Sequence, residues 1–89
     1  MNKLFDVISG TGYAEPILIL LPNAAHVLEA ITDIMEQARD RNLQTIKVTR
    51  MQLNVVVPMR GHVPVYFVDT LSQVKSFDAC TVVNWKGVT

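Results

Sequence analysis

Five consecutive aliphatic residues, Ile17 to Leu21, are the feature that most restricts how this chain can fold. Successive side chains of a β-strand point to opposite faces of the sheet, so a strand made only of Ile and Leu is apolar on both faces. Such a strand has to be covered on both sides, as in the middle of a layered domain. We therefore expect helices over one face of a sheet. Over the other face we expect the N-terminal segment, a second subunit or a partner.

The composition favours one small domain, over residues 1–89, that buries part of its surface against a partner. Apolar residues make up 49% of the chain and charged residues 18%, whereas about 25% charged residues is usual for a soluble domain. Eight basic and eight acidic residues cancel, which argues against attraction of the whole molecule to nucleic acid or an anionic membrane. The single Cys80 allows no internal disulfide and fits a reducing, cytoplasmic location.

The sequence carries no set of residues typical of catalysis or of metal binding. His26 and His62 are the only two histidines, and neither has a partner at the spacing of a metal site. No nucleophile, base and acid can be assembled, so we expect a protein that is not an enzyme and has no cofactor or metal. The longest apolar stretch is too short to span a bilayer, so no membrane partner is expected.

Apolar spacing and turn residues predict the first elements after the strand at 17–21. A stripe of apolar residues at helical spacing predicts an amphipathic helix over 24–41. The stripe consists of Val27, Leu28, Ile31, Ile34, Met35 and Ala38. Asn23 is expected to cap this helix and Asn42 to end it. Residues 44–57 alternate as a strand, but the parity changes near Thr49-Arg50, which predicts a bulge or tight bend there.

The C-terminal part of the chain predicts a hairpin, a short helix and a last strand. Residues 58–61 have the composition of a turn, and Val63–Val68 is expected to be the returning strand of the hairpin. Thr70 and Gln73 have the spacing of a capping box, which predicts a helix over 70–77. Residues 79–85 predict the closing strand.

This order of elements predicts the ferredoxin-like βαββαβ sandwich. That α+β fold has an antiparallel sheet with, in this chain, one long and one short helix on one face. If residues 70–77 are irregular, the expected fold is a one-helix α+β roll. In both cases we expect Leu4, Phe5, Val7 and Ile8 to form an extra strand or a flap across the sheet.

The uncovered face of the sheet is one candidate docking surface. If the odd positions of 51–57 face the helices, then Gln52, Asn54 and Val56 face outward. Tyr66 or Phe67, and Asn84 or Trp85, join them according to the register. A mixed polar and aromatic face suits protein docking. The alternative is that the aromatic side chains lie in the core and that residues 1–9 cover this face. The candidate residues are Gln52, Asn54, Tyr66 and Trp85.

A second candidate surface is an acidic stripe on the predicted long helix. Glu29, Asp33, Glu36 and Asp40 recur at helical spacing opposite the apolar stripe. Like charges at this spacing destabilise a helix slightly, so they do not contribute to the fold. The stripe is either a solvated outer face or a docking surface for a basic partner.

Residues 60–67 resemble the third-strand signature of RNA-recognition-motif domains at Arg60, Gly61, Val65 and Phe67. The resemblance covers eight residues and implies a sheet face that binds single-stranded RNA. It departs from the signature at His62 and Pro64, where these domains carry the aromatic rings that stack on bases. The residues expected to bind nucleic acid in this alternative are Lys47, Arg50, Arg60, His62 and Tyr66.

Together these features predict a small, non-enzymatic protein-interaction or regulatory module. We expect it to dock to a larger protein and to self-associate, as a dimer, through a sheet edge or the open sheet face. A small inhibitor of the kind that phages and mobile elements encode has this size and this lack of a catalytic site. The alternative function is a single-stranded RNA- or DNA-binding domain that uses the sheet face.

Overall fold

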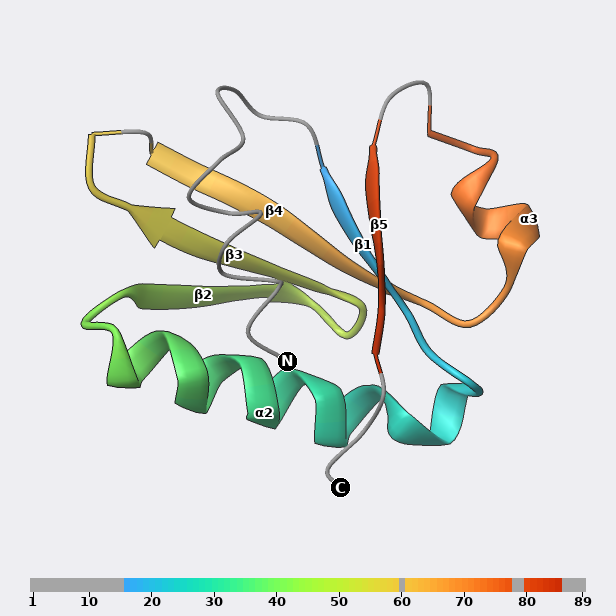
Figure 1. Ribbon diagram of the computed structural model, residues 1–89, viewed down its shortest axis with the longest axis horizontal. Coiled ribbons are helices and arrows are strands. Elements are labelled where there is room, and N and C mark those ends of the chain that lie inside the picture. Colours follow the sequence, from blue (N-terminus) through green and yellow to red (C-terminus); the bar gives the residue numbers. More distant parts are fainter. Residues whose placement is uncertain (1–15, 60, 78–79, 86–89) are drawn as a thin grey trace.

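The aliphatic segment forms β1 (Ile17–Leu20), an inner strand of a five-stranded sheet (Figure 1). The computed structural model describes residues 16–59, 61–77 and 80–85. The remaining elements are η1 (Ala24–His26), α2 (Val27–Asp40), β2 (Gln44–Thr49), β3 (Gln52–Val57), β4 (Gly61–Val68), α3 (Leu71–Val74) and β5 (Thr81–Asn84). The strand order is β2-β3-β4-β1-β5, so the domain is α+β with one main helix, η1 and α2 in continuous succession.

The sheet is mixed, and the prediction of an antiparallel sheet is wrong for β1. This strand runs parallel to both of its neighbours, with Ile17 beside Val65 of β4 and beside Thr81 of β5. Parallel strands are joined by crossovers that cover the sheet, and their sequences are typically unbroken aliphatic runs. The run at Ile17–Leu21 is therefore better explained as a parallel strand than as one of the antiparallel strands of a ferredoxin-like sandwich.

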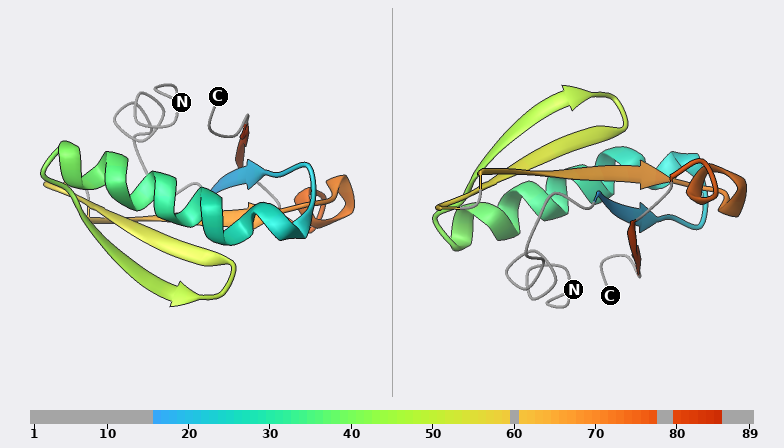
Figure 2. Two further views of the ribbon diagram at one scale, coloured as in Figure 1. Left: turned by 90° about the horizontal axis from the view of Figure 1, so that it is seen from below. Right: turned by 90° about the horizontal axis from the view of Figure 1, so that it is seen from above.

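Residues 44–57 form two strands instead of one, which is why the βαββαβ order is not matched. β2 and β3 pair as an antiparallel hairpin around Arg50-Met51, and the register shifts between Lys47 and Thr49. The tight bend and the irregularity predicted from the change of parity are both present. The extra strand makes β2, β3 and β4 an antiparallel meander, and the sheet twists strongly, so that β2 runs at a clear angle to β1 (Figure 2).

The second predicted helix, over 70–77, is reduced to the four residues of α3. The predicted capping box is present, because the backbone N–H of Thr70 donates to Gln73 Oε1 (3.1 Å) and that of Gln73 donates to Thr70 Oγ1 (3.4 Å). Two turn hydrogen bonds, made by the backbone N–H groups of Ser76 and Phe77, follow it. The structure has one long helix, so in this respect it is closer to the predicted one-helix alternative than to the two-helix fold.

Both predicted ends of the long helix are confirmed. The side chain of Asn23 accepts a hydrogen bond from the backbone N–H of Ala25 (2.9 Å) and caps η1. At the other end Asn42 has a φ of 58°, and the N–H of Leu43 donates to the carbonyl of Ala38 (2.9 Å). A residue in the left-handed region reverses the chain and satisfies the last free carbonyls of the helix. The chain then enters β2 at the far edge of the sheet, so α2 crosses over β4 and β3.

The hydrophobic core lies between α2 and one face of the sheet. Alternation along the strands directs Ile17, Ile19, Leu53, Val55, Val63, Val65 and Phe67 toward Ala30, Ile31, Ile34 and Ala38 of α2. Leu18 is also fully buried but lies on the opposite side of β1. The predicted apolar stripe is thus correct at its centre and wrong at its margin, because Leu28 is 70% and Met35 37% exposed.

Two sets of predicted features lie outside the described residues. These are the N-terminal segment with Leu4, Phe5, Val7 and Ile8, and the loop residue Arg60. Among the helices of the described residues, none is long and apolar enough to cross a membrane.

Candidate functional site

The exposed side of α2 and η1 carries an open groove of about 420 Å³, here called the acidic groove. It is lined by Ala25, Leu28, Glu29, Thr32, Asp33 and Glu36. The lining residues recur at three- and four-residue intervals, so they lie on neighbouring turns of one helix. Three carboxylates therefore line the same groove as an aliphatic side chain, Leu28, that the fold leaves in solvent.

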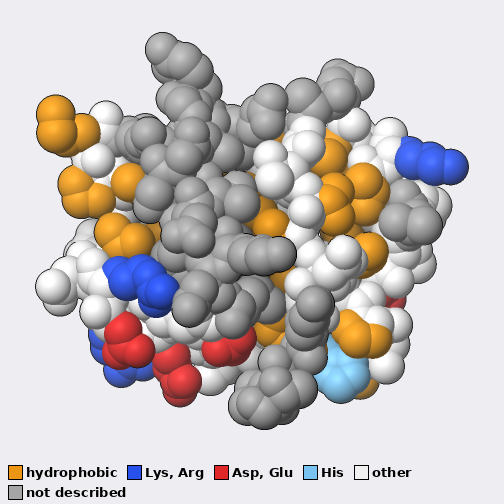
Figure 3. All heavy atoms as spheres, in the orientation of Figure 1, with side chains coloured by type: hydrophobic (Ala, Val, Ile, Leu, Met, Phe, Trp, Pro, Cys, Tyr) orange, Lys and Arg blue, Asp and Glu red, His pale blue; other side chains and the backbone are white. Residues whose placement is uncertain are grey.

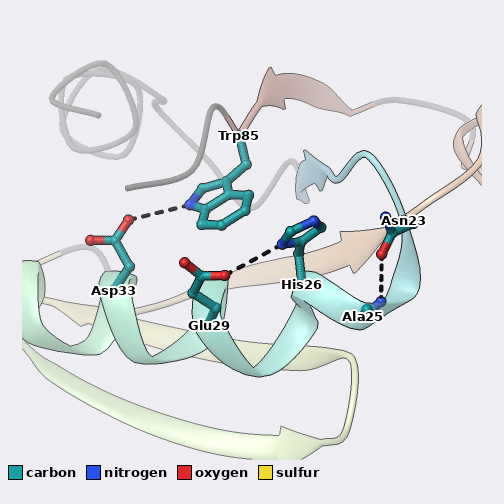
Figure 4. A network of polar contacts seen from close by, with 6 residues as sticks. All are labelled: Asn23, Ala25, His26, Glu29, Asp33 and Trp85. Carbon is teal, nitrogen blue, oxygen red and sulfur yellow. Dashed lines mark hydrogen bonds and ion pairs between the residues drawn. The ribbon is translucent and has the colours of Figure 1, made fainter. Parts of the chain in front are cut away.

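Asp33 links the acidic groove to the last strand (Figure 4). The Nε1–H of Trp85, the residue after β5, donates to Asp33 Oδ2 (3.3 Å), and the side-chain amide of Gln37 donates to Asp33 Oδ1 (2.9 Å). The Trp85 ring also lies 5.6 Å from the His26 ring, centroid to centroid, and His26 Nδ1 lies 3.3 Å from Glu29 Oε2. Hydrogen bonds to both carboxylate oxygens hold the Asp33 side chain against this end of the helix.

The other acidic residues of the predicted stripe are exposed on α2. Glu29, Glu36 and Asp40 are exposed, and acidic side chains gather over α2 in Figure 3. Among the described residues no Lys or Arg forms an ion pair with them, and Glu29 contacts the ring of His26. The structure places Glu29, Asp33 and Glu36 in the groove, while Asp40 lies one turn beyond its lining.

The second predicted surface, the open sheet face, is the side of the five strands that points away from α2. Gln52, Asn54 and Val56 lie there as predicted, and Tyr66 joins them as the partner of Gln52 in the register. Gln52 donates to Asn54 within this face (3.3 Å), and the Tyr66 ring packs against Phe77 at 5.1 Å. All five side chains are half-buried.

Two aromatic residues that could have joined this face lie in the core. Trp85 is only 4% exposed and Phe67 is buried, and both belong to the cluster that faces α2. The placement of Trp85 in a docking surface on the open sheet face is therefore wrong. The cause is register: Thr81 and Val83 lie beside Ile17 and Ile19, so the odd residues at this end of the chain point toward α2.

The residues expected to bind nucleic acid are not brought to one face. Tyr66 and His62 point to the open sheet face, whereas Lys47 pairs with Leu53, whose side chain lies in the core on the other side. Arg50 is exposed at the β2–β3 turn, and Arg60 lies outside the described residues. Within the described segments no group of three or more His, Cys, Asp and Glu residues is placed to hold a metal ion.

Leu28, Ala25 and Thr32 are the groove residues that sequence reasoning missed. The spacing predicts Leu28 in the buried stripe, but a rotation of 100° per residue places it at one edge of that stripe, about 120° from Ile34. That angle was the available signal, because a residue at the margin of an apolar stripe is buried only if a neighbouring element covers it.

Comparisons of the chain with models of protein families, with curated proteins and with solved structures found no match.

Proposed function

We propose that this chain is a small, non-enzymatic regulatory module that docks to a larger protein through the acidic groove. The observation that carries the proposal is the exposed Leu28 among three carboxylates on one rigid helix. An isolated exposed leucine is ordinary, but an exposed apolar side chain beside several charges of one sign has the features of a docking site. The partner surface that fits it is basic, with an apolar side chain to contact Leu28.

Charge and rigidity both support this use of the groove. Among the described residues no Lys or Arg forms an ion pair with Glu29 or Glu36, and Glu29 contacts the ring of His26. Asp33 is already held by Trp85 and Gln37, so this groove residue is fixed before a partner arrives. Ordering a surface in advance lowers the entropy cost of association. A module of this kind inhibits or redirects its partner by occupying a surface.

Single-stranded nucleic acid binding, the alternative function, has weaker support. Binding of single strands combines stacking rings with a positively charged groove. Tyr66 supplies one ring on the open sheet face, but its pairing with Phe77 occupies one side of that ring. The basic side chain within the strands, Lys47, lies beside the core residue Leu53 in the register. It therefore points to the other face of the sheet from Tyr66.

Affinity capture from a nuclease-treated native extract tests the proposal when the bait is varied. Glu36→Lys places a positive charge in the groove, and Asp40→Lys makes the same change of net charge one turn away from it. We expect Glu36→Lys to reduce capture of the partner at least tenfold and Asp40→Lys to reduce it much less. Capture should also weaken as salt is raised, because steering by exposed charges is screened.

Two results would contradict the proposal. Equal losses with Glu36→Lys and Asp40→Lys would mean that net charge, and not the groove, attracts the partner. Capture that disappears after nuclease treatment would favour the nucleic-acid alternative. Leu28→Ala is a third bait variant in the same capture experiment. The side chain is exposed, so its removal leaves the fold intact while it removes the proposed apolar anchor.

A further inference from the structure

Strand β2 is an open edge of the sheet. It lies at one end of the strand order, and no strand among the described residues lies beyond it (Figure 2). Its side chains reach solvent: Ile46 is 44% and Val48 49% exposed, and within the strand only Thr45 is half-buried. Natural proteins usually protect long edges with proline, with charge or by keeping the strand very short. β2 has six residues, no proline and one charged residue, Lys47, so it is poorly protected.

The hydrogen bonds of the next strands determine which backbone groups of β2 face this edge. The N–H of Phe67 donates to the carbonyl of Met51 (2.8 Å), one step beyond the first pair of the β3–β4 register. Along an antiparallel strand, the hydrogen-bonding groups of successive residues point to opposite sides. The odd residues of β3 therefore bond to β4, and its even residues, among them Asn54, bond to β2.

Thr45 and Lys47 present their backbone groups at the open edge. Ile46 is the partner of Asn54 in the β2–β3 register, so its N–H and C=O point inward to β3. Those of its two neighbours, Thr45 and Lys47, therefore point outward. The outward set ends there, because the N–H of Leu43 donates to a carbonyl in the last turn of α2 (2.9 Å) and the register shifts after Lys47.

We propose that two copies of this chain pair through β2, antiparallel and related by a two-fold axis at Ile46, to form one continuous sheet. In this register Thr45 of each copy lies opposite Lys47 of the other, so the outward backbone groups of both copies bond reciprocally. Ile46 meets Ile46 of the second copy, which removes part of an exposed aliphatic side chain from water. Both α2 helices lie on the same side of the joined sheet. The contact is isologous, so it closes after two copies.

Charge and hydrogen bonding select this register and favour a second copy as the occupant. A two-fold axis at Lys47 would place like charges directly opposite each other, which destabilises a strand pair. An axis at Thr45 would place Lys47 opposite Leu43, whose N–H is already used by the end of α2. With the axis at Ile46, each Lys47 lies opposite a neutral Thr45, and β2 is its own complement. The inference does not depend on the proposed function, because it uses β2 and not the acidic groove.

Amide hydrogen exchange, followed by NMR on the unmodified chain, tests the pairing. The contact is one strand about 20 Å long, small for a protein interface, so we expect a dissociation constant of about 0.1 mM. At about 20 μM the amides of Thr45 and Lys47 should exchange quickly while that of Ile46 is protected, because only Ile46 bonds to β3. At about 2 mM most chains are paired, and exchange at Thr45 and Lys47 should slow about fivefold.

Charge substitutions at Thr45 test the register. Thr45→Glu places opposite charges beside each other on both sides of the two-fold axis and should lower the dissociation constant at least threefold. Thr45→Lys places like charges there and should raise it at least threefold. Val82→Glu and Val82→Lys make the same changes of charge on β5, at the other edge of the sheet, and should leave it unchanged. Fluorescence of the single Trp85 verifies that the variants are folded.

Three results would overturn the proposal. The first is exchange at Thr45 and Lys47 that stays the same from about 20 μM to about 2 mM. The second is a dissociation constant that moves in the same direction with Thr45→Glu and Thr45→Lys, because net charge and not the register would then govern association. The third is an equal weakening by the substitutions at Val82, which would place the contact at β5.

Discussion

At the scale of single residues, Ile34 and Leu28 of α2 have different roles: Ile34 stabilises the fold, and Leu28 is available for docking. The two side chains come from one helix and were both predicted to be buried, yet Ile34 is fully buried and Leu28 mostly exposed. Ile34→Ala should lower the free energy of unfolding by about 3 kcal/mol, because it removes buried atoms and leaves a cavity. Leu28→Ala should change it by less than about 0.5 kcal/mol. Urea titration of both variants measures the difference, and a large loss with Leu28→Ala would mean that this residue belongs to the core.

Asp33 differs from the other acidic residues of α2 because it has a structural role as well as a place in the groove. Asp33→Ala leaves the Nε1–H of the buried Trp85 without its acceptor and should cost about 1 kcal/mol of stability. Glu36→Ala, on the exposed side of the same helix, should stay within about 0.5 kcal/mol of the wild type. Unfolding followed by Trp85 fluorescence checks both. Equal stability of the two variants would show that the Trp85–Asp33 hydrogen bond contributes nothing measurable.

At the scale of elements, the end of α2 depends on the backbone at Asn42. Its φ of 58° suits Gly or Asn, whereas a β-branched residue is strained there. Asn42→Gly should therefore alter the free energy of unfolding by only a few tenths of a kcal/mol, while Asn42→Val should lower it by about 1 to 2 kcal/mol. The side chain is exposed, so packing does not complicate the comparison. Thermal denaturation of the two variants is sufficient, and equal melting temperatures would contradict the role of this cap.

How far the elements could be predicted depended on how local their signals were. Asn23, Asn42 and the Thr70–Gln73 pair act over a few residues, so the ends of α2 and the start of α3 followed from the sequence. The change of parity in 44–57 located the irregularity, but alternation alone does not distinguish a bulge from a complete reversal of the chain. Strand order and direction depend on contacts distant in sequence. The one available signal for them, the unbroken run at Ile17–Leu21, suited a parallel strand better than the antiparallel sheet that the element order favoured.

At the scale of the whole molecule, sequence reasoning located the two candidate surfaces better than their boundaries. The acidic stripe and the outward positions of β3 followed from the periods of helix and strand. The sequence predicts Trp85 on the open sheet face and Leu28 in the core, and both predictions are wrong. Exposure at the margin of an element depends on which neighbouring element covers it. Trp85 points toward α2 through the parallel register of β5, which the predicted fold did not contain.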